Sequence, residues 1–317
     1  MAAERGKHII LEKPMALNLE DCDAIINAVD RSGVHLIVGH TLSYSPNVRA
    51  IRRVIVSGEF GRLRMISNLN YTNFLYRPRR PEELDTAQGG GILFNQVPHQ
   101  VDSVRFLGGG KLRSVRATTG VWDAERPTEG ACMAFLEFED GAAATIVYSG
   151  YDHFDSDEFC AWVGEGGQPA KPDMHGQARA ALRAFPTREA EASAKEDTGF
   201  GGRNERQVKV NSVRHQPHIG VLLVSCERAD LRPSADGVLV YSDDGKEERV
   251  IPRDPWIPGK GDVVDELYQV VFRNVPPVHD GRWGKATLEA CLAIQRSALE
   301  HKEVSLKHQV STPLPAA

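Results

Sequence analysis

The chain has 317 residues, which is too many for one small domain and predicts two packed units. Its hydrophobic fraction of 41% and charged fraction of 26% are those of a soluble globular protein. Lys and Arg number 38 against 43 Asp and Glu, and the net charge of −5 excludes the strong basic excess of most proteins that bind nucleic acid or anionic membranes.

The first part of the chain alternates between strand and helix patterns. Residues 8–11 are a short apolar run typical of a strand. Asn18 stands where a helix N-cap belongs, ahead of a periodic apolar stripe, and Gly33 is the expected stop. Residues 35–39 are almost wholly apolar, which indicates a strand buried on both faces of a parallel sheet.

A second helix is predicted to begin at Ser45-Pro46 and to end at Gly58. The Ser45 hydroxyl is its expected cap, and Pro46 suits the first helical position. Residues 64–72 then alternate in polarity as a strand does. Residues 73–88 follow as a polar loop rich in Arg and Pro.

Residues 94–107 are predicted to form one helix, and a mostly antiparallel sheet follows it. Asp140-Gly141 is a strong hairpin signal between two strand-like runs. Strands are expected at 112–122, 130–138 and 142–150, and later at 219–226, 238–241 and 249–251. Two amphipathic helices, at 261–274 and 283–300, close the pattern.

Residues 164–215 interrupt this pattern with alanine, glycine and charged residues and few large apolar ones. We interpret them as an exposed insertion with one short helix near 176–196 and with partial disorder. The predicted fold class is therefore α/β followed by α+β, with a large, mostly antiparallel open sheet.

Signals for membrane insertion, secretion and metal binding are missing from the sequence. No apolar run reaches about 18 residues, and the N-terminus lacks the apolar core of a secretory signal. The 5 cysteines are scattered and never form a C-x-x-C pair, which favours reduced thiols and offers no zinc site. We therefore expect a cytoplasmic protein without a metal.

A parallel α/β start raises the possibility of a nucleotide-binding fold, which holds its pyrophosphate on a G-x-G-x-x-G turn. None of the glycine clusters in this sequence has that spacing. Two explanations remain open. Either there is no dinucleotide site, or its phosphate-binding half lies upstream of Met1.

Two motifs resemble those of the Gfo/Idh/MocA oxidoreductases. Residues 6–17 read Gly-Lys-His-Ile-Ile-Leu-Glu-Lys-Pro-Met-Ala-Leu, similar to the family's G-K-H-V-x-x-E-K-P-x-A. Residues 89–102 read Gly-Gly-Gly-Ile-Leu-Phe-Asn-Gln-Val-Pro-His-Gln-Val-Asp, similar to G-G-G-x-L-x-D-x-G-x-H-x-x-D. Within the family, residues 223–230 and the polar insertion resemble phthalate 4,5-cis-dihydrodiol dehydrogenases.

The resemblance implies a Rossmann domain without its first strands and helices, followed by an α+β domain whose open sheet forms a homo-oligomer. The predicted domains are a partial dinucleotide-binding domain over 1–60, a substrate and dimerisation domain over 61–306 and a tail over 307–317. A chain without the phosphate-binding half is expected to bind NAD poorly.

Lys13 ends a buried strand, at the sheet edge where open α/β folds bind ligands. The resemblance places Glu12, Lys13 and Pro14 at the cofactor, and Lys13 also at the substrate hydroxyl. His99 and Asn95 are expected on one face of one helix. Because imidazole titrates near neutrality, His99 suits acceptance of a hydroxyl proton. Lys13, His99 and Asn95 are the predicted catalytic residues.

Asn95 departs from the family, which has aspartate there. An amide can hydrogen-bond a hydroxyl but cannot act as a base, so proton transfer falls to His99 or Lys13. Pro98 would lie in the first turns of the helix, and its local geometry is expected to differ. Asp102 is interpreted as structural.

The substrate is expected to be anionic. Residues 41–44 lack the arginines found in many sugar-acting members of the family. Arginine forks match carboxylates well, although an arginine-rich loop is usually only solvated. We predict substrate contacts from His40, Tyr44, Arg77 and Arg80.

The predicted activity is NAD- or NADP-dependent dehydrogenation of a cis-dihydrodiol of an aromatic carboxylate to the dihydroxy aromatic. Aromatisation would drive the oxidation. The alternatives are a sugar or inositol dehydrogenase of the same family, and a truncated chain that only dimerises. No nucleic-acid or membrane partner is expected.

Overall fold

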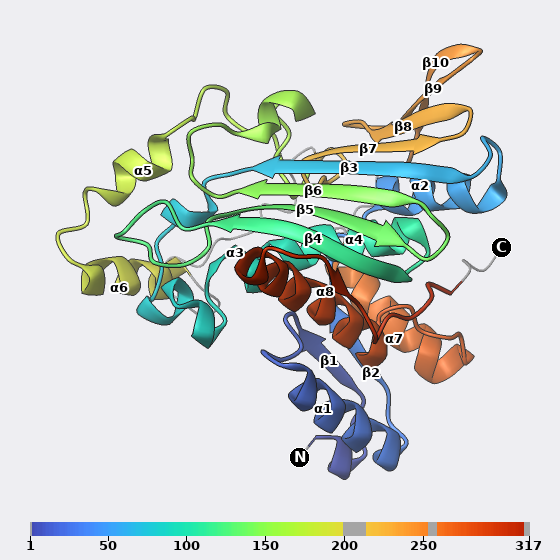
Figure 1. The fold of residues 1–317 in the computed structure, drawn as a ribbon, viewed down its shortest axis with the longest axis horizontal. Helices are drawn as coiled ribbons and strands as arrows, with labels where there is room; N and C mark the ends of the chain where they lie inside the picture. The colour runs from blue at the N-terminus through green and yellow to red at the C-terminus, as the bar shows by residue number, and fades with distance from the viewer. Residues whose placement is uncertain (1, 199–213, 253–258, 314–317) are drawn as a thin grey trace.

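The computed structural model describes residues 2–198, 214–252 and 259–313. Its strands form a two-stranded sheet and a nine-stranded sheet, with helices packed between and around them (Figure 1). Five short 3₁₀ segments lie in the connections of the described part: η1 (Ala3–Arg5), η2 (Phe74–Tyr76), η3 (Pro81–Leu84), η4 (Thr86–Gln88) and η5 (Ser156–Cys160).

The small sheet pairs β1 (Ile9–Glu12) with β2 (Leu36–Gly39) in parallel, and α1 (Leu19–Ser32) connects them. The predicted caps of α1 are confirmed, because Asn18 Oδ1 accepts a hydrogen bond from the Asp21 amide at 2.7 Å and Gly33 has a φ of 60°. Two parallel neighbouring strands end at the same sheet edge. The residues after β1 and β2 are therefore brought together.

Helix α2 (Pro46–Ser57) begins and ends where predicted, but the expected Ser45 cap is wrong. The Ser45 side chain makes no capping bond, because Asn47 Oδ1 takes the Val48 amide in the first turn at 2.8 Å. The helix packs against α4 and against strands β8 and β9 of the large sheet. The domain division at residue 60 stays a prediction.

The large sheet has the strand order β10-β9-β8-β7-β3-β6-β5-β4-β11. The central pair β3–β6 is parallel and its other pairs are antiparallel, so the predicted mostly antiparallel sheet is confirmed. β8 was not predicted. The strands are β3 (Leu63–Tyr71), β4 (Leu112–Gly120), β5 (Ala131–Phe138), β6 (Ala143–Ser149), β7 (Val221–Cys226), β8 (Ala229–Pro233), β9 (Gly237–Ser242), β10 (Gly245–Val250) and β11 (Val304–Ser305).

Helix α8 (Gly281–Glu300) connects the two sheets, because it packs on α1 and β2 at the small sheet and on β4 and α4 at the large one. α7 (Lys260–Arg273) lies beside β2. Asp280 caps α8 by accepting the Trp283 amide at 2.8 Å, and the Trp283 ring is fully buried. The small sheet is thereby held next to the helices that cover the large sheet (Figure 1).

The single helix predicted over 94–107 is wrong. Two helices occur there, α3 (Gly91–Asn95) and α4 (Val97–Gly108), with Gln96 between them at φ −114°. Pro98 lies in the first turn of α4, where its missing N–H is tolerated. Asn95 and His99 consequently belong to different helices, and the expected same-face relation of one helix does not hold.

The insertion holds two helices, α5 (Gln177–Leu182) and α6 (Arg188–Thr198), where one was predicted. Pro186 lies between them, and the residue before a proline is disfavoured in the helical conformation. Figure 1 shows both helices on one side of the molecule, beyond the ends of the sheet strands. Residues 199–213 of the insertion, and the disorder expected for part of it, lie outside the described residues.

One face of the large sheet carries exposed apolar side chains, although the helix-covered face is buried. The exposed set comes from β3, β5 and β7: Met65, Met133, Phe135 and Leu223. Such a patch is typical of a protein interface, and the homo-oligomer predicted through this sheet stays a proposal. Among the described helices, none combines the length and the apolar character needed to cross a membrane.

Candidate active site

Lys13 lies at the carboxyl end of β1, directly after the strand. Its Nζ donates a hydrogen bond of 2.5 Å to the Asn95 carbonyl at the end of α3. Burial lowers the pKa of Lys13 to about 8, with Glu12 opposing the shift. The amine is therefore fixed in position and partly deprotonated near neutral pH.

His40 directly follows β2 and is 2% exposed. Both of its ring nitrogens are buried without a hydrogen-bond partner in the described part of the chain. Burial lowers the pKa of His40 to about 4, and the Asp102 carboxylate opposes this only in part. The ring is neutral at physiological pH and has unused hydrogen-bonding capacity.

His99 lies in the first turn of α4 and is partly buried. Its Nδ1 has no partner within the described residues. Burial holds the pKa of His99 well below its usual range, and the charges of Lys13 and His40 add to this. The parallel register pairs Glu12 with Gly39, so Lys13 and His40 follow neighbouring strand ends, and the Lys13 hydrogen bond to the Asn95 carbonyl brings the α3–α4 junction that precedes His99 to the same edge.

Asn95 belongs to the same group through its backbone carbonyl, which accepts the Lys13 hydrogen bond. Its side-chain Nδ2 donates to the carbonyls of Gly89 at 3.1 Å and Gly91 at 2.8 Å. These two hydrogen bonds fix the side-chain amide of Asn95. Its Oδ1 can still accept a hydrogen bond from the hydroxyl of a ligand.

A buried network supports this group from α4 and α8. Asp102 Oδ1 accepts a hydrogen bond from Trp283 Nε1 at 2.6 Å. The guanidinium of Arg105 lies 3.9 Å from the Trp283 ring centroid and donates to Thr287 Oγ1 at 2.7 Å. Sequence reasoning missed Arg105 and Trp283, and the available signal was an arginine amid the apolar residues of a predicted helix.

Tyr44, which was predicted to contact substrate, has its hydroxyl and its ring engaged by other residues, and the predicted contact stays a prediction. Its hydroxyl donates to Glu266 on α7, and its ring stacks on His279 with the centroids 4.3 Å apart. Burial and the Glu266 carboxylate raise the pKa of Tyr44. The hydroxyl is committed to a contact that holds α7 against β2.

The arginines of the 77–80 loop differ in where they point. Arg80 is exposed and pairs with Glu82 at 3.2 Å and with Glu83 at 3.6 Å, so the structure does not bring it to Lys13. Arg79 is buried, donates to the Phe74 carbonyl at 2.7 Å and pairs with Glu83 at 3.3 Å.

Arg77 is partly buried, and its Nε donates to Asn73 Oδ1 at 2.7 Å. Burial raises the pKa of Tyr148 on β6, and the charges of Arg77 and Arg79 oppose that shift. Along this loop Arg77 is partly buried, Arg79 is buried and Arg80 is exposed. Arg79 and Arg80 both pair with Glu83, at 3.3 Å and 3.6 Å, and the predicted substrate contacts of Arg77 and Arg80 stay predictions.

The group fits the nicotinamide end of a dinucleotide. Lys13 supplies a partly buried amine, and the ring nitrogens of His40 and His99 that lack a partner in the described residues are buried near it. Glu12 is exposed at the end of β1, and Pro14 follows Lys13 through a cis peptide bond. The sequence contains no glycine-rich turn that would hold the pyrophosphate, so these residues concern only the nicotinamide end of a dinucleotide.

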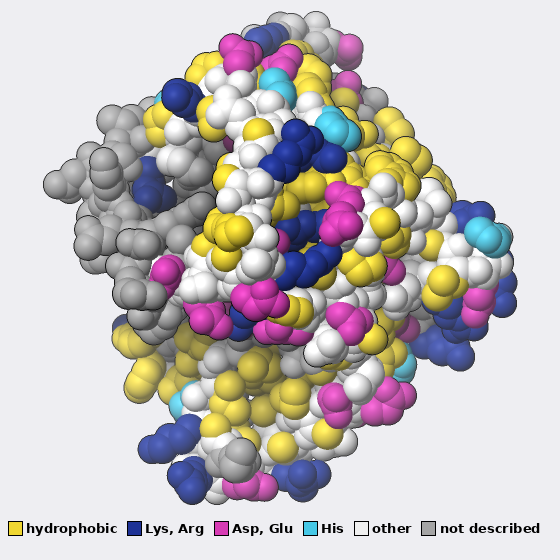
Figure 2. Space-filling view, turned by 90° about the vertical axis from the view of Figure 1, so that its left-hand side faces the viewer, with side chains coloured by type: hydrophobic (Ala, Val, Ile, Leu, Met, Phe, Trp, Pro, Cys, Tyr) yellow, Lys and Arg dark blue, Asp and Glu magenta, His cyan; other side chains and the backbone are white. Residues whose placement is uncertain are grey.

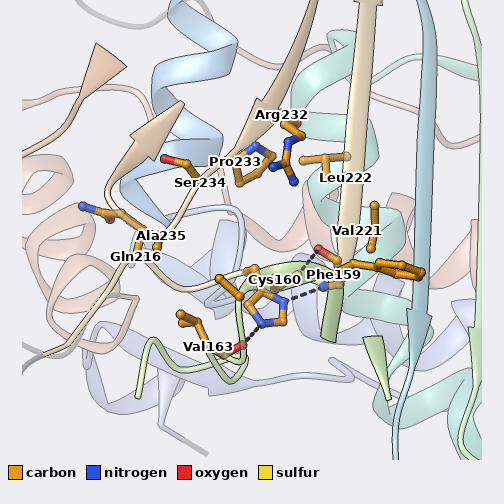
Figure 3. Close-up of a pocket in the computed structure, with 13 residues that line it drawn as sticks. Phe159, Cys160, Val163, Gln216, Val221, Leu222, Arg232, Pro233, Ser234 and Ala235 are labelled. Atoms are coloured by element: carbon orange, nitrogen blue, oxygen red, sulfur yellow. Dashed lines mark hydrogen bonds between the residues drawn. The ribbon is translucent and has the colours of Figure 1, made fainter. Parts of the chain in front are cut away.

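Another cavity, of about 210 Å³, lies between η5 and strands β7 and β8 (Figure 3). His218 in its wall accepts the Gly220 amide at Nδ1 and donates from Nε2 to the Val163 carbonyl, at 2.9 Å and 2.6 Å. Both ring nitrogens are thus used by backbone groups. His218 is a structural residue of this cavity, and none of the predicted site residues lines it.

Both parts of the chain match models of oxidoreductase domains, and a dehydrogenase is similar to most of the chain. Residues 1–40 match an oxidoreductase family with an NAD-binding Rossmann fold, and residues 48–168 match the GFO/IDH/MocA C-terminal domain. The chain is 39% identical over 296 residues to the 1-carboxy-3-chloro-3,4-dihydroxycyclo hexa-1,5-diene dehydrogenase of Comamonas testosteroni, across 93% of this chain and 74% of that protein.

Two further proteins extend the comparison. The scyllo-inositol 2-dehydrogenase (NAD(+)) of Bacillus subtilis strain 168 is 29% identical over 152 residues, across 47% of this chain and 43% of that protein. A protein of Bordetella bronchiseptica RB50 with a known crystal structure is 49% identical. It superposes with a TM-score of 0.89 over 96% of this chain and 78% of its own.

Proposed function

This chain belongs to the Gfo/Idh/MocA family of NAD-dependent oxidoreductases, and on that premise we propose that it oxidises a cis-dihydrodiol of an aromatic carboxylate to the dihydroxy aromatic. The observation that carries the proposal is the placement of Lys13 and His40 at the carboxyl ends of β1 and β2, with the α3–α4 junction and His99 held to them by the Lys13 hydrogen bond. The similarity to a Comamonas testosteroni dehydrogenase that is named for a carboxylated dihydroxycyclohexadiene supports the choice of substrate class.

Oxidation of a secondary alcohol removes a hydride from carbon and a proton from oxygen. Bound NAD supplies the hydride acceptor. Lys13 is the best base for the hydroxyl proton, because burial gives its amine a pKa of about 8. His99 has a pKa well below the usual range, so its neutral ring is a weak base but a good hydrogen-bond partner for the same hydroxyl.

Asn95 would orient the neighbouring hydroxyl of the diol, since its Nδ2 is fixed by two glycine carbonyls and its Oδ1 remains to accept a hydrogen bond. The loss of hydride and proton leaves a hydroxy-dienone. That product becomes the dihydroxy aromatic when the remaining ring C–H proton moves to oxygen, so the reaction balances and aromatisation drives it forward.

The charge of the substrate is argued from Arg77 and Arg79. Arg77 is partly buried and Arg79 is buried in the loop that precedes α3, although Arg79 also pairs with Glu83 at 3.3 Å. A guanidinium within reach of the bound substrate would suit a ring carboxylate better than a neutral polyol.

The function is tested by measuring NADH formation by the 317-residue protein with NAD in excess. We expect faster turnover on a dihydrodiol of an aromatic dicarboxylate than on myo-inositol or glucose. Faster turnover on either polyol would contradict the proposal and favour the sugar or inositol alternative. Absence of turnover on all three, with NAD binding intact, would also contradict it.

Replacement of Arg77 tests the carboxylate contact. Arg77→Ala should raise KM about tenfold or more and change kcat by less than about threefold, because ground state and transition state share the carboxylate. Arg80→Ala is the matched control, since Arg80 already pairs with Glu82 and Glu83 at the surface. Equal KM values in the two variants would place the substrate carboxylate elsewhere.

A further inference from the structure

A pocket of about 390 Å³ lies between the insertion and the β4–β5 connection. Residues 179–191 of the insertion form one wall, and Tyr76 with residues 123–126 forms the other. Figure 2 faces this end of the molecule and shows Lys and Arg side chains gathered around a hollow. The volume is typical of a small-molecule site, roughly 300–1,000 Å³. None of the catalytic candidates lines it.

The pocket carries more positive charge than its own acidic residues neutralise. The Glu191 carboxylate pairs with Arg126 at 2.7 Å, and Glu125 pairs with Arg188 at 3.2 Å. The side chains of two other lining arginines, Arg179 and Arg183, form no ion pair with the residues that the structure describes, although the Arg179 backbone amide donates to Asp152. The third acidic residue in the wall, Asp123, accepts the Tyr76 hydroxyl. The arrangement favours an anion.

Two of these arginines are held in fixed orientations. Arg126 is 3% exposed, and its Nη1 is buried without a hydrogen-bond partner in the described residues. A buried guanidinium nitrogen without an acceptor is unfavourable, and Arg126 contributes its positive charge to the pocket wall together with Arg179 and Arg183. Arg179 lies 4.0 Å from the Tyr76 ring centroid and donates to the Tyr151 carbonyl at 3.2 Å. The site is therefore built from the fold as well as from surface charge.

The remaining wall is apolar. Leu182, Phe185 and Pro186 line the pocket on the insertion side, next to the arginines. An inorganic anion would leave this apolar surface unused, whereas a carboxylate on a carbon ring or chain would cover it.

We infer that this pocket binds an organic carboxylate, with its anionic group held by Arg179 and Arg183 above Arg126 and its apolar body against Leu182 and Phe185. The inference does not depend on the proposed reaction. Glu191 also accepts the Arg79 amide at 2.8 Å, so an occupied pocket would contact the same helix that holds the 77–80 loop.

Calorimetric titration of the full-length enzyme with benzoate, without NAD, tests the inference. We expect saturable binding with a Kd below about 1 mM. Arg183→Ala should weaken it at least about tenfold, because a hydrogen bond to a charged group is lost. Arg188→Ala is the matched control on the same rim, and it should weaken binding less than about threefold because Arg188 already pairs with Glu125.

Further titrations distinguish binding in this pocket from binding in the catalytic site, and they identify the ligand of the pocket. Lys13→Ala should leave benzoate binding unchanged even where turnover is lost. Tighter binding of 3,4-dihydroxybenzoate than of benzoate would support an aromatic product as the natural ligand, and equal binding of cyclohexanecarboxylate would support a wider set of organic acids. The inference would be overturned if benzoate showed no saturable binding, or if Arg183→Ala left the Kd unchanged. It would also be overturned if Arg77→Ala abolished binding, or if inorganic phosphate competed equally well.

Discussion

Replacement of Lys13 by alanine is expected to lower kcat about 10²-fold or more, the usual range for loss of a general base. The amine lies at the end of β1, bonded to the Asn95 carbonyl at 2.5 Å, and burial lowers its pKa to about 8. A base must be unprotonated to act. Turnover should therefore rise with pH through about 8 and level off above it, and this dependence should disappear in Lys13→Ala.

Two further variants distinguish a role of the Lys13 amine in proton transfer from a role of its positive charge. Lys13→Arg keeps a positive charge that does not titrate in the accessible range, so it should be as impaired as Lys13→Ala. Lys7→Ala is the control, because Lys7 is exposed at the other end of the same segment. Near-normal turnover in Lys13→Arg would show that the cation, not the base, matters. An unchanged pH profile in Lys13→Ala would move the base elsewhere.

The first strand–helix–strand unit could be predicted because its signals are local. The Asn18 cap, the Gly33 stop and the apolar run of β2 each depend on residues close together in sequence. The same local logic located Lys13, since a residue after a parallel strand lies at the ligand-binding edge of the sheet. His40 follows β2 in the same way.

Helix boundaries near Pro98 were not predictable by the same means. A proline in the first turn fits either a new helix or the start of one long helix, and the apolar pattern continues across the break. The structure ends α3 at Asn95 and begins α4 at Val97. The Lys13 hydrogen bond to the carbonyl of Asn95 depends on that ending.

Contacts between distant parts of the chain set the surroundings of Tyr44 and of the loop arginines. Tyr44 donates to Glu266, and the two residues are 222 positions apart in the sequence. Among the loop arginines, Arg79 is buried through Phe74 while Arg80 pairs with Glu82 at the surface. No local pattern distinguishes neighbouring arginines in one loop, because their orientation is set by tertiary packing.

Replacement of His99 by alanine is the second change with a large expected effect, again about 10²-fold in kcat. The ring lies in the first turn of α4 with Nδ1 buried and unpartnered in the described chain, and burial holds its pKa well below the usual range. A neutral imidazole at this position can hold the substrate hydroxyl while Lys13 takes the proton. Loss of that hydrogen bond removes the alignment of the hydroxyl with the amine.

The pH profile of His99→Ala distinguishes this role from that of a base. If Lys13 is the base, the variant keeps the rise through about pH 8 at a reduced plateau, because the amine that titrates there is still present. If His99 were the base, the wild-type rise would lie below the ordinary histidine range, since its pKa is lowered, and it would vanish in the variant. His153→Ala is the control because His153 is exposed, and thermal unfolding of both variants checks that each is folded. Unchanged turnover in folded His99→Ala would exclude the residue from catalysis and leave Lys13 to align and deprotonate the substrate unaided.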